Sequence, residues 1–207
     1  AVAYRKPEWA AEVFRYLVSQ QYEDGHTPHQ CNPVEKLPAE ARIHIDNPLW
    51  LPMVAWAIIA ETGDASLLDE RLPWLSEEDN LSPTGEASIW QHLQRTTDFL
   101  ESNLGAHGIP LTHKGDWNDS IGKFSKHGRG ESLMAAQQYV HALGILADLA
   151  RLRGDTGEAG RLEGLRAKQE HAILACAWDG AWWKRGFDDD GNPIGSHSCE
   201  FGKSWRD

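Results

Sequence analysis

Residues 113–132 carry the side chains whose types and spacing could do chemistry. They read HKGDWNDSIGKFSKHGRGES, with Trp117 placed between the carboxylates of Asp116 and Asp119. A carboxyl group pressed against an indole loses hydration, which raises its pKa and keeps it protonated near neutral pH. Such a group could hand a proton to a bound sugar. The alternative is an ordinary loop, in which Asp and Asn side chains bond their own backbone and glycines supply the turns.

Composition narrows the classes of partner. The 207 residues carry a net charge of −11, which argues against nucleic acid or an anionic membrane surface as a partner. The three cysteines are odd in number and lack CxxC spacing, which favours the reducing cytoplasm over a disulfide framework or a zinc site. The histidines are too scattered to predict any other metal site. Ten tryptophans hint at carbohydrate, because indoles stack on sugars, although most indoles fill cores.

The apolar pattern predicts a helical protein. Helical spacing recurs in six segments, at residues 7–22, 47–63, 64–75, 86–104, 131–153 and 155–177. Asn47 is a good N-cap for the second segment, with Pro48 at its first position. Short Gly-Asp joints between long helices indicate stacked helical hairpins. Residues 178–194 change period and predict a β-hairpin near residues 182–192, and no domain boundary interrupts residues 1–207.

Several motifs together resemble a known family. GDWND at residues 115–119 and GRGES at residues 128–132 are similar to motifs of the inverting disaccharide phosphorylases of glycoside hydrolase family ninety-four, which cleave cellobiose, chitobiose and related β-linked sugars. Four further stretches agree with that family in the same order: HIDNPLWL from His44, ETGDASLLDE from Glu61, AWDGAWWKRGFDDDGNPIGS from Ala177, and CEFGK from Cys199. The resemblance implies an all-α (α/α)6 barrel, incomplete here, with the small hairpin near its C-terminal end.

The resemblance also implies roles for single residues. Asp119 would be the general acid that protonates the leaving sugar oxygen, and Trp117 would line the pocket of the sugar being cleaved. Asp116 would orient neighbouring groups, and Asp46 would accept a sugar hydroxyl. The acceptor-sugar side of the cleft would involve Glu200 and Lys203.

The implied reaction uses inorganic phosphate as co-substrate and needs no cofactor or metal. Phosphate is already an anionic nucleophile, so it needs positive charge and N–H donors rather than a general base. Arg129 is the phosphate-binding candidate, because it sits between glycines at an expected helix start. Lys123 and Lys126 are interpreted as solvated loop residues, and Glu131 as a residue that could belong to the first helical turn.

Length separates this sequence from the family. Family members are several times longer, and six helices are about half of the twelve that a full barrel needs. We therefore expect residues 1–207 to be a partial barrel domain whose uncovered apolar faces would leave it marginally stable, prone to aggregation or paired as a homodimer. Three other functions stay open: an inverting hydrolase that uses Asp46 or Glu200 to activate water, the phosphorylase-like domain of a glucan synthase, and a non-catalytic carbohydrate-binding helical module.

Overall fold

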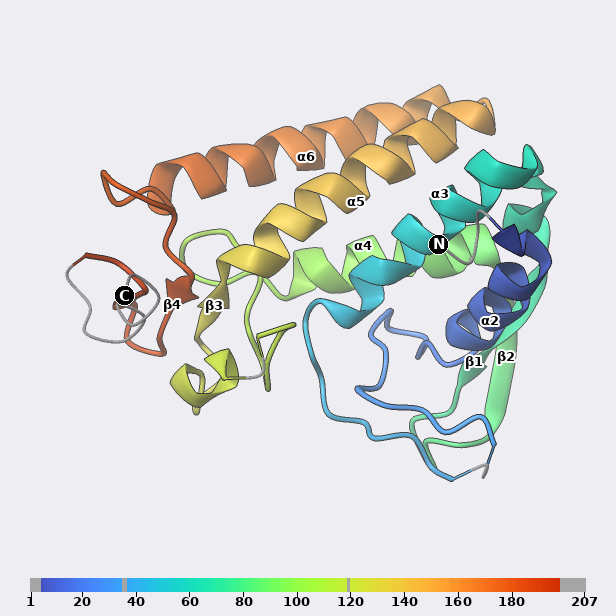
Figure 1. The fold of residues 1–207 in the computed structure, drawn as a ribbon, viewed down its shortest axis with the longest axis horizontal. Helices are drawn as coiled ribbons and strands as arrows, with labels where there is room; N and C mark the ends of the chain where they lie inside the picture. Colours follow the sequence, from blue (N-terminus) through green and yellow to red (C-terminus); the bar gives the residue numbers. More distant parts are fainter. Residues whose placement is uncertain (1–4, 35–36, 119, 198–207) are drawn as a thin grey trace.

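The computed structural model describes residues 5–34, 37–118 and 120–197, and within those ranges the chain is mostly helical (Figure 1). Its α-helices are α2 (Pro7–Val18), α3 (Trp50–Thr62), α4 (Ile89–Ser102), α5 (Leu133–Leu152) and α6 (Thr156–Cys176). Short 3-10 helices are η1 (Asn47–Leu49), η2 (Ala65–Asp69) and η3 (Ile121–Phe124). Two small antiparallel sheets accompany them, so the expectation of an all-α chain is confirmed for the helices but not for every segment.

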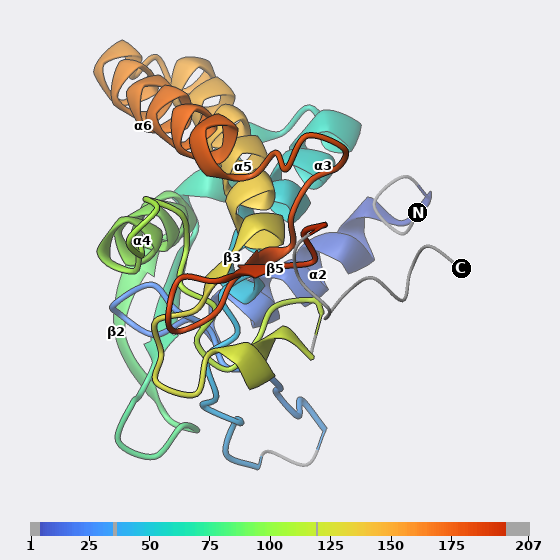
Figure 2. The same cartoon turned by 90° about the vertical axis from the view of Figure 1, so that its left-hand side faces the viewer.

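The long helices α5 and α6 form a hairpin that lies over α3 and α4 (Figures 1 and 2). Asp155 caps α6, since its Oδ1 accepts a hydrogen bond from the Glu158 N–H at 2.9 Å. Apolar side chains recur along α5 at helical spacing and are buried, and α5 packs against α6, α3 and α4, which makes it the centre of the core. No helix in the described part of the chain is long and apolar enough to cross a membrane.

The predicted helix over residues 64–75 is present only in its first part, as the 3-10 helix η2, and the rest of the prediction is wrong. Asp64 caps η2 through the Ser66 N–H, but the chain then extends into β1 (Arg71–Leu75). Pro73 has no N–H to continue a helix, so the segment instead pairs with β2 (Pro83–Ser88), whose last three residues were expected to begin the fourth helix. The fourth helix consequently begins at Ile89 rather than at residue 86, with Ser88 and Gln91 forming a capping box.

Asn47 does not cap a helix. The side chain makes no cap hydrogen bond, and α3 begins three residues later, after the turn of η1. Its Nδ2 instead donates to the carbonyl oxygen of Pro28 at 3.1 Å. Asn47 therefore ties the long loop after α2 to the entrance of α3.

Replacing Asn47 with Ala should lower the free energy of unfolding by about 1 kcal/mol, because the Pro28 carbonyl loses its donor. Asn47→Ser separates the two roles. Serine is a good N-cap, so it would restore stability if capping mattered, whereas its short hydroxyl cannot replace the amide donor. We expect both variants to be equally destabilised in urea unfolding, and a fully stable Asn47→Ser would contradict the tether.

The second sheet joins the tail of the chain to the start of α5. It contains β3 (Glu131–Ser132), β4 (Gly186–Phe187) and β5 (Pro193–Ile194) in that order, all antiparallel. The predicted C-terminal hairpin is present as β4 and β5, whose turn closes through the Asp188 N–H and the Asn192 carbonyl at 2.9 Å. Since β3 leads directly into α5, this sheet fixes where α5 begins.

Candidate functional site

Two segments that are distant in sequence lie side by side and bring two carboxylates together. The Ile45 N–H donates to the Gly115 carbonyl, and the Lys114 N–H donates to the Ile43 carbonyl, both at 3.1 Å. Gly115 is needed at this crossing, because a Cβ there would lie 2.9 Å from the His44 ring. The pairing places Asp46 and Asp116, the next residues along each segment, in one region of the molecule.

Asp116 anchors residues 115–124, which we call the acid loop. The side chain is only 1% exposed. One carboxylate oxygen accepts the Asn118 N–H at 2.6 Å, and the other accepts the hydroxyl of Ser132. Ser132 is the N-cap of α5, where its Oγ accepts the Ala135 N–H at 3.0 Å. Asp116 thus fastens the acid loop to the first turn of α5.

Asp46 is a buried carboxyl with one oxygen available. It is 2% exposed, and Oδ2 accepts a hydrogen bond from the Trp50 indole N–H at 3.3 Å. Oδ1 has no hydrogen-bond partner within the described residues. Burial raises the pKa of Asp46, the indole donor opposes that rise, and the nearby charge of Asp116 adds to it. Oδ1 is thus an unsatisfied acceptor that is itself buried, and a ligand hydroxyl reaches it only if the neighbouring side chains move.

A cavity of about 490 Å³ opens beside the acid loop, within the size range of small-molecule sites. The exposed indole of Trp117 lies on its wall, with its ring centroid 5.9 Å from that of Trp50. Trp183 is on the wall as well, although its position in the sequence predicted only a hairpin. The lining residues are Asp116, Trp117, Asn118 and Ile121 from the acid loop, Leu133, Met134 and Gln137 from α5, and Trp183, Lys184 and Arg185.

Three predicted site residues, Asp119, Glu200 and Lys203, lie outside the described residues. The structure brings the other sugar-site candidates, Asp46, Asp116 and Trp117, into one neighbourhood. In the described part of the chain, no group of three or more His, Cys, Asp or Glu side chains could hold a metal ion.

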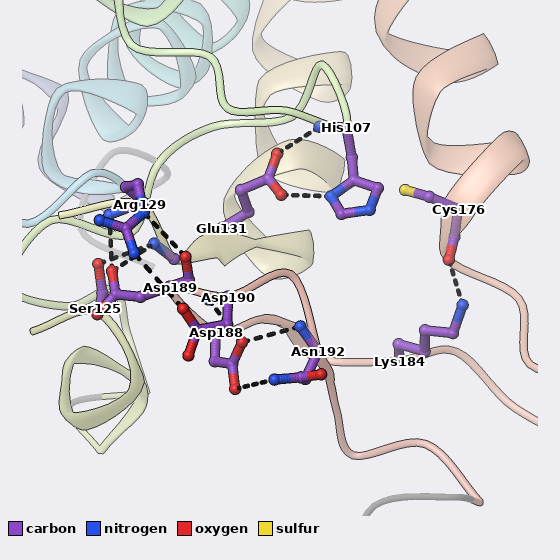
Figure 3. A network of polar contacts seen from close by, with 11 residues as sticks. His107, Ser125, Arg129, Glu131, Cys176, Lys184, Asp188, Asp189, Asp190 and Asn192 are labelled. Atoms are coloured by element: carbon purple, nitrogen blue, oxygen red, sulfur yellow. Dashed lines mark hydrogen bonds and ion pairs between the residues drawn. The ribbon is translucent and has the colours of Figure 1, made fainter. Parts of the chain in front are cut away.

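Arg129 is not at the helix start where the sequence placed it. The helix α5 begins at Leu133, and the Arg129 side chain lies among acidic residues (Figure 3). Its Nε donates to the Asp189 carbonyl at 2.9 Å, and its Nη2 is 3.5 Å from the Asp190 carboxylate. The dipole of α5 therefore does not favour an anion at Arg129.

Glu131 is a buried strand residue rather than a first-turn helix residue. One oxygen accepts the His107 N–H at 2.8 Å, and the other lies 2.5 Å from the His107 ring Nδ1 (Figure 3). Gly105 leaves room for this pair, since a Cβ there would be 2.4 Å from the Glu131 carboxylate. No sequence feature singled out His107, because its partner lies 24 residues away.

Comparison with known proteins agrees with the family that the motifs indicated. The family model for the glycosyl hydrolase 94 superfamily, catalytic domain, matches residues 1–207. A solabiose phosphorylase of Paenibacillus borealis is 34% identical over 203 residues, which cover 98% of this chain and 25% of that protein. A 3-O-beta-D-glucopyranosyl-beta-D-glucuronide phosphorylase of the same organism is 36% identical over 160 residues, covering 77% of this chain and 20% of that protein. The family resemblance is confirmed, and the chain spans about a quarter of the length of these relatives.

A solved structure supports the fold. The GH78 family rhamnosidase of Bacillus sp. GL1 aligns with a TM-score of 0.56 and 17% sequence identity, over 75% of this chain and 15% of that one. At this identity the similarity concerns the arrangement of the helices only.

Proposed function

This chain belongs to the glycosyl hydrolase 94 superfamily, and from that premise we propose that it forms part of the catalytic domain of a glycoside phosphorylase. The substrate would be a β-linked disaccharide or short oligosaccharide, and the product a sugar 1-phosphate of inverted configuration. The observation that carries the proposal is the cavity beside the acid loop, whose wall includes the Trp117 and Asp116 of the GDWND motif. Residues 1–207 would supply about half of one (α/α)6 barrel, with no internal domain boundary.

Each residue has a distinct task in this proposal. Asp119 donates its proton to the glycosidic oxygen while phosphate attacks the anomeric carbon from the opposite face. Trp117 packs its exposed indole against the sugar ring, and Asp46 accepts a sugar hydroxyl through its free oxygen. Asp116 is a positioning residue, because both of its oxygens are bonded to the protein. Glu200 and Lys203 would contact the acceptor sugar.

Binding of the phosphate makes its own demands on the site. Phosphate needs cationic groups and N–H donors in line with the glycosidic bond. To serve there, Arg129 would have to exchange its contact with Asp190 for the anion. Lys184 and Arg185 line the cavity, and Lys184 would have to exchange its 2.6 Å hydrogen bond to the Cys176 carbonyl for the anion.

The dependence of sugar release on phosphate tests this function. The chain is incubated with cellobiose and with N,N'-diacetylchitobiose, with and without inorganic phosphate, and sugar 1-phosphate and free sugar are quantified separately. We expect sugar 1-phosphate to form only when phosphate is present. Quenching of tryptophan fluorescence by the disaccharide measures binding independently, so that a chain that binds without turnover is distinguished from one that does not bind.

An inverting hydrolase is the second candidate, and Asp46 or Glu200 could activate water in it. A general base must be ionised, and burial has raised the pKa of Asp46, which disfavours that form. Release of free sugar at equal rates with and without phosphate would nevertheless favour hydrolysis and contradict the phosphorylase proposal.

A further inference from the structure

A second cavity, of about 500 Å³, shares no lining residue with the cavity beside Trp117. We call it the basic pocket. Its walls come from three segments: residues 41–43, residues 113–114 and residues 125–128. Five basic side chains line it, namely Arg42, His113, Lys114, Lys126 and His127, and no acidic side chain does. This concentration of positive charge stands out in a chain whose net charge is −11.

The walls of the basic pocket are held by backbone contacts. The Lys114 N–H bonds the Ile43 carbonyl at 3.1 Å, which joins the first two segments. The third segment rests on the carboxylate of Asp189, which accepts the N–H groups of His127 at 2.8 Å, Arg129 at 2.8 Å and Gly130 at 3.2 Å (Figure 3 shows the Asp189–Arg129 part). The basic side chains therefore project from a backbone whose position is fixed.

The carboxylate of Asp189, which contacts the third segment, is already occupied by backbone hydrogen bonds. Burial would raise the pKa of Asp189, but the three backbone donors outweigh burial and hold that pKa below its usual value. The ionised carboxylate thus serves the backbone rather than the cationic side chains. On the opposite wall, Arg42 pairs with Glu40 at 2.9 Å.

Lys114 and Lys126 keep uncompensated charge. Within the described residues, neither ammonium group forms an ion pair with a carboxylate, and both side chains are exposed. The sequence favoured a solvated role for Lys126, but the structure places Lys126 and Lys114 on the walls of one cavity. Two such ammonium groups match a doubly charged anion better than a single carboxylate, and the volume leaves room for more than the anion itself.

We propose that the basic pocket binds a small phosphorylated molecule of sugar-phosphate size, at a site separate from the cavity that contains Trp117 and Trp183. The phosphate group sits between the ammonium groups of Lys114 and Lys126, with His127 beside them. The rest of the molecule occupies the space along residues 41–43. This site is independent of the phosphate that would act as nucleophile.

Calorimetric titration with glucose 6-phosphate, with glucose as the uncharged reference, tests the proposal. The titration is done in roughly 0.15 M salt, where contacts between distant exposed charges are largely screened. We expect glucose 6-phosphate to bind and glucose not to bind at the basic pocket. The double variant Lys114→Ala/Lys126→Ala should weaken the binding by about tenfold or more, the ratio that corresponds to 1.4 kcal/mol.

Matched variants locate the site. Lys123 is an exposed lysine on η3 outside the basic pocket, so Lys123→Ala should bind glucose 6-phosphate like the wild type. Trp183→Ala removes a wall of the other cavity and should also leave this binding unchanged. Equal weakening by Lys123→Ala, loss of binding in Trp183→Ala, or a wild type that does not distinguish glucose 6-phosphate from glucose would each overturn the proposal. Since the readout is binding without turnover, these outcomes are independent of the phosphorylase activity.

Discussion

Replacing Asp119 with Asn is expected to lower the rate of disaccharide phosphorolysis by about 10²- to 10⁴-fold, the contribution of a positioned general acid. The amide is nearly isosteric with the carboxyl group but cannot release a proton to the glycosidic oxygen at neutral pH. Sugar binding should change little, because the indoles of Trp117 and Trp183 and the oxygen of Asp46 remain in place. The effect should therefore fall on kcat and leave KM nearly constant.

The dependence on the leaving group separates catalysis from structure. A glycosyl fluoride needs no protonated leaving oxygen, so Asp119→Asn should retain most of its rate with that substrate. Asp190→Asn is the matched control, since it makes the same chemical change at an exposed side chain outside the cavity. If Asp119→Asn loses both substrates equally, the residue is structural. If it loses neither, Asp119 is not the general acid.

The sequence predicted those elements whose determinants are local. The fifth helix was expected from nearly six turns of apolar spacing, and it is present with small shifts at its ends. The caps at Asp64 and Asp155 are local in the same way, because each Asp side chain bonds a backbone N–H two or three residues away. The family could be identified for a related reason, since its motifs are short and occur in a fixed order.

The sequence did not predict features that depend on a contact with a residue far away along the chain. Asn47 looks like a helix cap until the Pro28 carbonyl is seen beside it, and β1 looks helical until β2 pairs with it. The nearness of Asp46 to Asp116 depends on a backbone pairing between segments about 70 residues apart, which no local pattern encodes. Trp183 was missed for the same reason, because the tail that carries it reaches the cavity only by joining the sheet of β3.

Replacing Asp116 with Ala is expected to lower the free energy of unfolding by about 2–4 kcal/mol. The carboxylate is buried, and its removal leaves the Asn118 N–H and the Ser132 hydroxyl without their acceptor. The acid loop would lose its attachment to α5, so phosphorolysis should fall together with stability. Asp190→Asn again serves as the control, with an expected change within about 0.5 kcal/mol for an exposed position. Urea unfolding followed by tryptophan fluorescence measures each value.

A double-mutant cycle with Ser132→Ala identifies the contact responsible. Ser132→Ala alone should cost about 1–2 kcal/mol, because it removes both the N-cap of α5 and the donor to Asp116. If the Asp116–Ser132 hydrogen bond holds the acid loop, the double variant should be more stable than the sum of the single losses predicts, by roughly 0.5–3 kcal/mol. Additive losses would mean that the two residues act independently. The loop would then be held by its pairing with residues 43–45, and Asp116→Ala should leave the geometry of Trp117 and the binding of sugar intact.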